Sequence, residues 1–179
     1  MGRVFIPSTN LEGIFKGSYE KLHAQIKCTY LFYQLEIYSC KVTYSTHSEW
    51  MDMYINKSLM QKCPILRGGV SKMNRSKDNS VLLRWNDVIP SNSDEKKTNG
   101  LRAEFNICNG MSYGKKWKNA TEYLGIATKK DNIHFTREII LNPSLVRTEL
   151  QLLRNAACFE IIKCMVTNNI KQLATFNFS

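Results

Sequence analysis

Residues 28–66 read CTYLFYQLEIYSCKVTYSTHSEWMDMYINKSLMQKCPIL, and this stretch decides the fold that we expect. Between Leu31 and Tyr38 the odd positions hold Leu, Tyr, Leu and Ile, and the even positions hold Phe, Gln, Glu and Tyr. Such alternation with a period of two is typical of a strand that buries one face. Aromatic and branched residues also favour strands. We therefore expect a long strand with its odd-numbered side chains in the core.

The second half of this stretch predicts an amphipathic helix that begins near His47. Thr46 followed by Glu49 fits a capping box, in which the hydroxyl accepts a free amide hydrogen and the carboxylate reaches back. Pro64 lacks an amide hydrogen, so we expect it to end the helix. Apolar residues four positions apart form the inward stripe that this helix would need. They are Trp50 and Tyr54, and Met51, Ile55 and Leu59.

The size of the chain indicates one domain with its own core. A domain near 179 residues buries roughly 70% of the surface that its unfolded chain exposes. No run approaches the ~20 apolar residues that span a bilayer, and the N-terminus lacks the apolar core of a signal peptide. We therefore expect the protein to function on the cytosolic side of membranes.

The remaining segments predict several strands, a second helix and basic loops. The composition after Gly68-Gly69 indicates a flexible loop, and Asn109-Gly110 is a strong turn signal. Asn142-Pro143 marks a helix start, and the tail after it either extends this helix or forms a closing hairpin. Further strands are expected at 81–85, 101–107, 121–128 and 133–141, with the last two as a hairpin. The predicted class is α+β, a single domain with a mostly antiparallel β-sheet packed against two main helices.

The N-terminal segment, residues 1–25, shows no sustained periodicity and is interpreted as an arm, with residues 26–179 as the single α+β domain. Val4, Phe5 and Ile6 are three consecutive apolar residues, which are unfavourable to leave in water. Pro7 favours an extended conformation before it. We expect the three to bind a neighbouring subunit in a head-to-tail contact. The alternative is that the arm folds back on its own subunit.

The charge balance indicates a polyanionic partner, either nucleic acid or an anionic membrane. The formal net charge is +10 and the sequence pI is about 9.4, which attracts polyanions. Two groups of cations carry the excess in segments that we expect to be loops. The first group is Arg67, Lys72, Arg75 and Lys77, and the second is Lys115, Lys116 and Lys118.

Catalytic and metal-binding patterns are missing from the sequence. The six cysteines are scattered without a Cys-x-x-Cys pair, so we expect reduced thiols, no metal and no cofactor. His23, His47 and His134 have no neighbouring carboxylate or cysteine pattern of a known catalytic kind. We expect a binding or structural protein and not an enzyme.

The segment 49–66, EWMDMYINKSLMQKCPIL, resembles the core of rhabdovirus matrix proteins, in particular those of plant-infecting, cytorhabdovirus-like members. In that family a long aromatic strand leads into a helix that contains a tryptophan. Five residues match its pattern one by one, namely Trp50, Asp52, Met53, Tyr54 and Ile55. The chain departs from the vesiculovirus-like pattern, because it has neither a lysine-rich N-terminal tail nor a Pro-Pro-x-Tyr motif.

The resemblance implies a non-enzymatic matrix-like domain that self-assembles, binds the inner face of an anionic membrane and condenses the viral ribonucleoprotein. The implied partners are further copies of the chain, the viral nucleoprotein–RNA, the anionic membrane surface and the viral glycoprotein. The implied localisation is the virion beneath the envelope, and the host cytoplasm and membranes. The alternative is a sequence-independent RNA-binding protein, such as a viral silencing suppressor, in which Tyr113 and Trp117 stack on bases.

Overall fold

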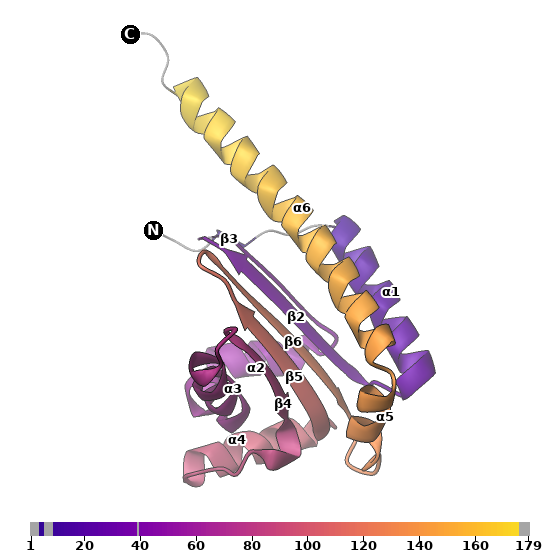
Figure 1. Cartoon of the computed structure of the whole chain (residues 1–179). Helices are drawn as coiled ribbons and strands as arrows, with labels where there is room; N and C mark the ends of the chain where they lie inside the picture. Colours follow the sequence, from indigo (N-terminus) through magenta and orange to yellow (C-terminus); the bar gives the residue numbers. More distant parts are fainter. Residues whose placement is uncertain (1–3, 6–8, 39, 176–179) are drawn as a thin grey trace.

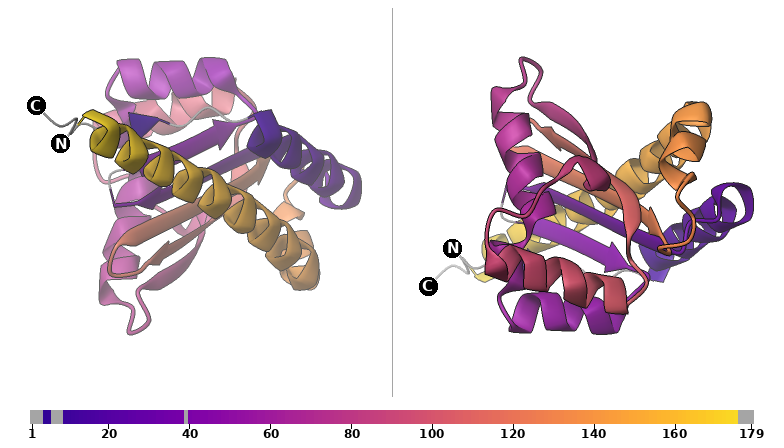
Figure 2. Two further views of the ribbon diagram at one scale, coloured as in Figure 1. Left: turned by 90° about the horizontal axis from the view of Figure 1, so that it is seen from above. Right: turned by 90° about the horizontal axis from the view of Figure 1, so that it is seen from below.

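The computed structural model describes residues 4–5, 9–38 and 40–175, together with the side chains of most of them. A twisted β-sheet forms the centre, and helices cover both of its faces (Figures 1 and 2). The helices α1, α5 and α6 lie on one face, and α2, α3 and α4 lie on the other. This arrangement confirms the predicted α+β class with a mostly antiparallel sheet.

The sheet holds six strands in the order β1-β3-β2-β6-β5-β4 within the described residues. All neighbouring pairs are antiparallel except β1 with β3, which is parallel. The strands are β1 (Val4–Phe5), β2 (Tyr30–Ile37), β3 (Cys40–Ser45), β4 (Ser80–Arg84), β5 (Asn109–Lys116) and β6 (Ala120–Thr128). Strand β2 therefore lies near the middle of the sheet, as the long aromatic run predicts.

Both faces of β2 are covered, and this gives its two sets of side chains different surroundings. Leu31, Tyr33 and Leu35 are buried in a core shared with α1 and α6, which confirms the predicted inward face. Tyr30 and Phe32 on the opposite face pack in a second core with residues of α2 and α3. The sheet is thus the middle layer between two helix layers.

The first layer consists of α1 (Thr9–Ile26), α5 (Phe135–Leu141) and α6 (Pro143–Thr175). The irregular arm expected for residues 1–25 is wrong from Thr9 onward. Leu11, Phe15, Leu22 and Ile26 are buried at spacings of four, seven and four residues, and this face anchors α1 in the core. The strand expected at 133–141 is also wrong, since this segment includes α5 and packs against β5.

The long helix α6 resolves the alternative that the sequence left open for the C-terminal tail. It begins at Pro143 as the Asn-Pro pair predicts, and it runs without interruption to Thr175. Its far end extends past the sheet (Figure 1). Among the described residues, no helix is both long enough and apolar enough to cross a membrane.

The second layer consists of α2 (Ser48–Asn56), η1 (Leu59–Lys62), α3 (Pro64–Arg75), η2 (Trp85–Asp87) and α4 (Ser93–Glu104). The prediction that α2 begins next to His47 is confirmed. The capping box is wrong, because the hydroxyl of Thr46 accepts the amide hydrogen of Leu31 at 3.0 Å and so serves the strand. In the predicted stripe, Trp50 and Leu59 are buried, whereas Ile55 is exposed.

Two segments expected to be extended or loop-like are helices in this layer. Pro64 begins α3 instead of ending α2, since a proline fits the first helical position, whose amide has no partner. The basic segment 67–78 is therefore largely helical, held by the buried side chains of Ile65 and Met73. The expected strand 101–107 lies mostly within α4, which Asn92 caps by accepting the amide hydrogen of Glu95 at 2.9 Å.

Gly110 is part of β5 and does not form the turn that Asn109-Gly110 predicts. A Cβ atom at this position would lie 2.7 Å from the ring of Trp85 and 2.7 Å from the backbone oxygen of Ile126. Contacts this short are not tolerated, so only glycine lets Trp85 pack closely on the sheet. The sequence requires a glycine at this position because Trp85 packs closely on the strand, and not because the chain turns there.

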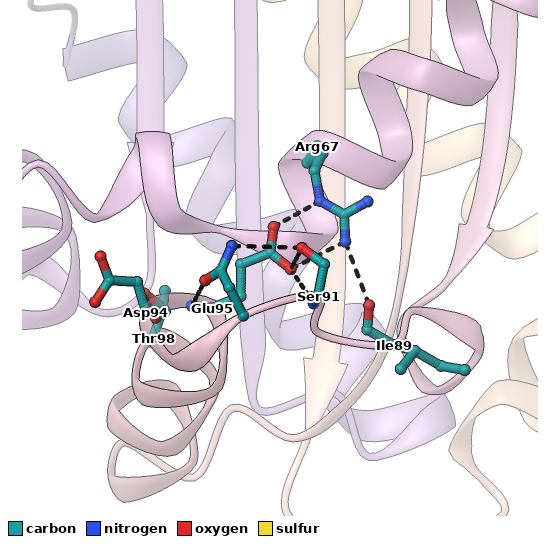
Figure 3. Close-up of polar contacts among 7 residues, drawn as sticks. Arg67, Ile89, Ser91, Asp94, Glu95 and Thr98 are labelled. Atoms are coloured by element: carbon teal, nitrogen blue, oxygen red, sulfur yellow. Dashed lines mark hydrogen bonds and ion pairs between the residues drawn. The ribbon is translucent and has the colours of Figure 1, made fainter.

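An ion pair fastens α3 to the start of α4 (Figure 3). Arg67 donates to the two carboxylate oxygens of Glu95 at 2.6 and 2.9 Å, and also to the backbone oxygen of Ile89 at 3.3 Å. The backbone amide of Ser91 donates to the same carboxylate at 2.7 Å. These bonds, chiefly those from Arg67, lower the pKa of Glu95 to about 2.

We expect this pair to make stability depend on pH. The pKa of Glu95 is lower in the folded chain than its ordinary value of 4.5, so the charged carboxylate stabilises the fold at and above that pH. The contribution falls as the pH drops from about 4.5 towards 2. Glu95→Gln should lower the melting temperature at pH 7, and the difference from the parent should shrink on acidification. Glu104→Gln, an exposed change on the same helix, should alter the melting temperature little at any pH; a constant Glu95→Gln deficit down to pH 2.5 would contradict the prediction.

Candidate functional site

A cavity lies between the second face of the sheet and the layer formed by α2, η1 and α3. Its volume is about 480 Å³, within the range of small-molecule pockets, ~300–1,000 Å³. Alternate residues of β2 form its floor from Tyr30 to Glu36, and Tyr123 and Gly125 of β6 continue it. The alternation that buries the odd-numbered side chains of β2 in the first core thus places its even-numbered side chains in the cavity.

Aromatic rings enclose one end of the cavity. The ring centroids of Trp50 and Tyr54 on α2 are 5.2 Å apart, and Phe105 lies 5.7 Å from Trp50. Tyr30 and Trp85 lie 6.3 Å apart. Aromatic side chains in such arrays offer large apolar surfaces with defined shape, so this end suits a flat or linear apolar group.

Few polar groups line the aromatic end, and several of them are already bonded or neutral. The indole nitrogen of Trp85 donates to the hydroxyl of Ser112 at 2.7 Å. Burial raises the pKa of both Tyr30 and Tyr54 well above the ordinary value for a phenol, and Cys63 adds to the effect at Tyr54. Both phenols therefore remain neutral at physiological pH.

Arg102 of α4 is a cation at this aromatic end. Its guanidinium carbon lies 4.8 Å from the centroid of the Trp85 ring, and its Nε donates to the backbone oxygen of Ile107 at 3.0 Å. Burial lowers the pKa of this guanidinium. The neighbouring titratable groups that raise the pKa are thiols and phenols, namely Cys63, Cys108, Tyr54 and Tyr30.

The sequence matches no protein-family model and no curated protein, but several solved structures are similar to this one in shape. SdiA in complex with octanoyl-rac-glycerol gives a TM-score of 0.56 at 14% identity, covering 86% of this chain and 60% of that one. The likeness shows that the chain has the same fold as this SdiA structure. The fold also matches SdiA 1–171 from E. coli in solution, with a TM-score of 0.54, 17% identity and coverage of 82% of this chain and 89% of that one.

The VqsR LBD domain from Pseudomonas aeruginosa has the same fold. Its TM-score is 0.52 at 12% identity, covering 81% of this chain and 94% of that one. The present chain spans about 60% of the length of the SdiA chain in the complex with octanoyl-rac-glycerol, and of the SdiA chain in a crystal structure of the Escherichia coli protein. At these identities the likeness establishes the fold alone.

The predicted basic groups lie beside each other, away from the aromatic end of the cavity. The backbone amide of Lys116 donates to Asn79 at 2.9 Å, and the amine of Lys115 donates to the backbone oxygen of Asp78 at 2.6 Å. The turn after α3 therefore meets the end of β5. Five residues of the two basic groups are exposed, namely Lys72, Arg75, Lys77, Lys116 and Lys118. Arg67 and Lys115 instead form ion pairs, with Glu95 and Asp78, and a polyanion-binding role for the group stays a prediction.

Both members of the predicted stacking pair lie beside Arg154 of α6, but they differ in exposure. Tyr113 is half-buried and packs against the core shared with α6. Trp117 lies in the turn between β5 and β6, is 39% exposed, and has the guanidinium of Arg154 5.6 Å from its ring centroid. Their role in stacking on RNA stays a prediction.

The N-terminal residues predicted to bind a neighbouring subunit form part of the sheet. Val4 and Phe5 make up β1, which pairs in parallel with Cys40 and Lys41 of β3 in the same chain. Ile6 lies outside the described residues. The head-to-tail contact stays a prediction.

Within the described part of the chain, no group of three histidine, cysteine or acidic residues lies close enough together to hold a metal ion.

Sequence reasoning missed the cavity and the residue Arg102. The segment 101–107 was assigned to a strand, which placed Arg102 on a solvent face. The signal that was available is Asn92 followed by Glu95 three residues later, a pattern of helix N-termini. A helix starting there places Glu95, Thr98 and Arg102 on the side that packs against the body.

Proposed function

We propose that this domain binds a small amphipathic molecule with a linear acyl chain in the cavity between the sheet and α2–α3. The observation that carries the proposal is the cavity itself, about 480 Å³ in volume and lined by Trp50, Tyr54, Trp85 and Phe32. Apolar surface left uncovered in a cavity of this size costs stability, and an apolar ligand offsets that cost.

Two observations support an acyl chain as part of the ligand: the shape of the cavity lining and the ligand of a structural neighbour. Most of the wall is apolar, with side chains of β2, α2 and α3 among its members, which favours hydrocarbon over a sugar or nucleotide. The SdiA structure of the same fold holds octanoyl-rac-glycerol. We extend that class of ligand to this chain because its own cavity is elongated along β2, from Tyr30 to Glu36, about 20 Å at the rise of a strand.

Intrinsic fluorescence tests the proposal directly. Trp50 and Trp85 line the cavity, and Trp117 does not, so a Trp117→Phe background reports on the cavity alone. We expect 1-octanoylglycerol to change this emission saturably. Gly125→Leu should abolish the change or weaken binding at least ~10-fold, because a leucine here would point between Phe32 and Trp85 and fill ligand space.

The matched control is the same substitution on the other face of the sheet. Gly17 of α1 is exposed and has no atom within 4 Å of the position of a Cβ, so Gly17→Leu should bind as the parent does. The absence of any saturable change with acyl ligands of six to twelve carbons, or equal binding by Gly125→Leu, would overturn the proposal.

The matrix function stays a prediction, with its self-assembly, anionic membrane and viral nucleoprotein–RNA partners, and so does the alternative of RNA binding. The contiguous exposed cations near Lys77 and Lys116 favour contact with a polyanion. Such contact is compatible with ligand binding, because the aromatic end of the cavity and the basic surface are formed by different residues.

A further inference from the structure

Arg102 holds a positive charge at the cavity wall without an acidic partner. Its guanidinium carbon lies 4.8 Å from the centroid of the Trp85 ring, and its Nε donates to the backbone oxygen of Ile107 at 3.0 Å. The other titratable groups that act on it are the thiols and phenols named above. No carboxylate among the described residues forms an ion pair with it. A guanidinium has five N–H donors, so those of its two terminal nitrogens remain available to a ligand.

Two other cations of the second layer, on α3 and η1, differ from Arg102 in this respect. Arg67 on α3 is neutralised by Glu95, and Lys62 is 3.4 Å from Asp94. Within the cavity, Lys41 lies opposite Glu36 in the pairing of β2 with β3. Of the three charged residues that line the cavity, Glu36, Lys41 and Arg102, the first two cancel, and the wall carries a net charge of +1.

An uncompensated charge in a mostly apolar site is unfavourable unless it is paired when the site is occupied. The contact with Trp85 and the bond from Nε to Ile107 hold the guanidinium in place at the wall, and a planar guanidinium matches the two oxygens of a carboxylate. A phosphate monoester carries between one and two negative charges, more than one arginine balances. The charge and geometry of this wall therefore favour a single carboxylate.

We infer that the ligand of the cavity is an acyl chain with a carboxylate head, a medium-chain fatty acid, and that Arg102 binds its carboxylate. The inference rests on the proposed function. The chain of the ligand extends from Arg102 past Trp85 towards Gly125 and Phe32, which lie opposite each other on β6 and β2. Arg102 thus determines the head group, and the aromatic wall accepts the hydrocarbon.

Calorimetric titration with two ligands that differ only in the head group tests this assignment. Octanoate is charged at pH 7, and octanamide has the same shape without the charge. We expect the parent to bind octanoate at least ~30-fold more tightly, since removing one partner of a buried charged pair costs at least that factor. Arg102→Met should weaken octanoate binding by a similar factor and leave octanamide binding within about threefold.

The variant Arg137→Met is the matched control, since Arg137 is exposed on α5 on the other side of the sheet; it should keep the preference for octanoate. Arg102→Lys keeps the charge but not the fork of donors, so it should retain part of the preference.

Equal binding of the two ligands by the parent would overturn the role of Arg102 and leave the proposed function standing. Binding of neither ligand would overturn both. The comparison on the parent protein does not depend on whether Arg102→Met folds.

Discussion

Arg154→Met should lower the free energy of unfolding by about 3–5 kcal/mol, which is the expected cost of leaving a buried charge without its partner. The charge is that of Glu122 on β6, whose side chain is 0% exposed and faces α6. Arg154 donates from Nη2 to Glu122 at 2.6 Å and from Nε to both oxygens at 3.1 Å. The hydroxyl of Tyr33 donates to the same carboxylate at 2.8 Å. Urea denaturation measures the loss.

A second variant separates the cost of the orphaned charge from the loss of arginine contacts. Glu122→Gln combined with Arg154→Met removes both charges and keeps an oxygen that accepts the Tyr33 hydroxyl. It should recover more than half of the lost stability, because replacing a whole buried ion pair costs far less than breaking it. Arg147→Met is the same change at an exposed position of α6, and it should stay within about 0.5 kcal/mol of the parent. A double variant no more stable than Arg154→Met would contradict this account.

Trp50→Ala should lower the free energy of unfolding by about 3–5 kcal/mol, the usual cost of truncating a buried large aromatic side chain. Trp50 is 3% exposed and contacts the rings of Tyr54 and Phe105. The spacing of Trp50 and Tyr54 along the expected helix already predicted that this side chain faces inward, and the structure confirms it. Because Trp50 also lines the cavity, the truncation should weaken binding of acyl ligands in the same protein.

The control for Trp50 is the tryptophan in the turn between β5 and β6. Trp117→Ala removes a ring that is 39% exposed and lies under Arg154, and a cation–π contact at such a site is worth about 0.5–1 kcal/mol. Thermal melting of the two variants should therefore differ by several degrees. Equal melting temperatures would show that the core around Trp50 relaxes into the space left by the indole.

Local patterns identified those elements whose sequences are dominated by burial on one face. The alternation in 31–37 predicted β2, the apolar run 81–85 predicted β4, and Asn142-Pro143 predicted the start of α6. Where one residue type has two uses, the local pattern led to the wrong element. Pro64 ends a helix or begins one, and glycine at 110 permits a turn or a close contact. Tertiary packing decides between these uses.

The candidate site was harder to predict from the sequence than the fold. Tyr30, Trp50, Trp85 and Arg102 come from four separate elements, and no spacing in the chain relates them. Their meeting depends on the order of the strands and on the position of α4, which is set by Arg67 binding Glu95 across 28 residues. Short-range periodicity carries no information about such contacts.

The sequence by itself determined that the chain is one α+β domain with a central aromatic strand and a tryptophan-bearing helix after it. It determined this because alternation and helical spacing report directly which side of an element is apolar. Only the tertiary structure decided that helices cover both faces of the strand, and that the layer of α2, η1 and α3 leaves a cavity between itself and the sheet. The reason is that a cavity is a mismatch between the shapes of two packed layers, and its charge is what remains after distant residues have paired; neither quantity exists until the layers are in contact.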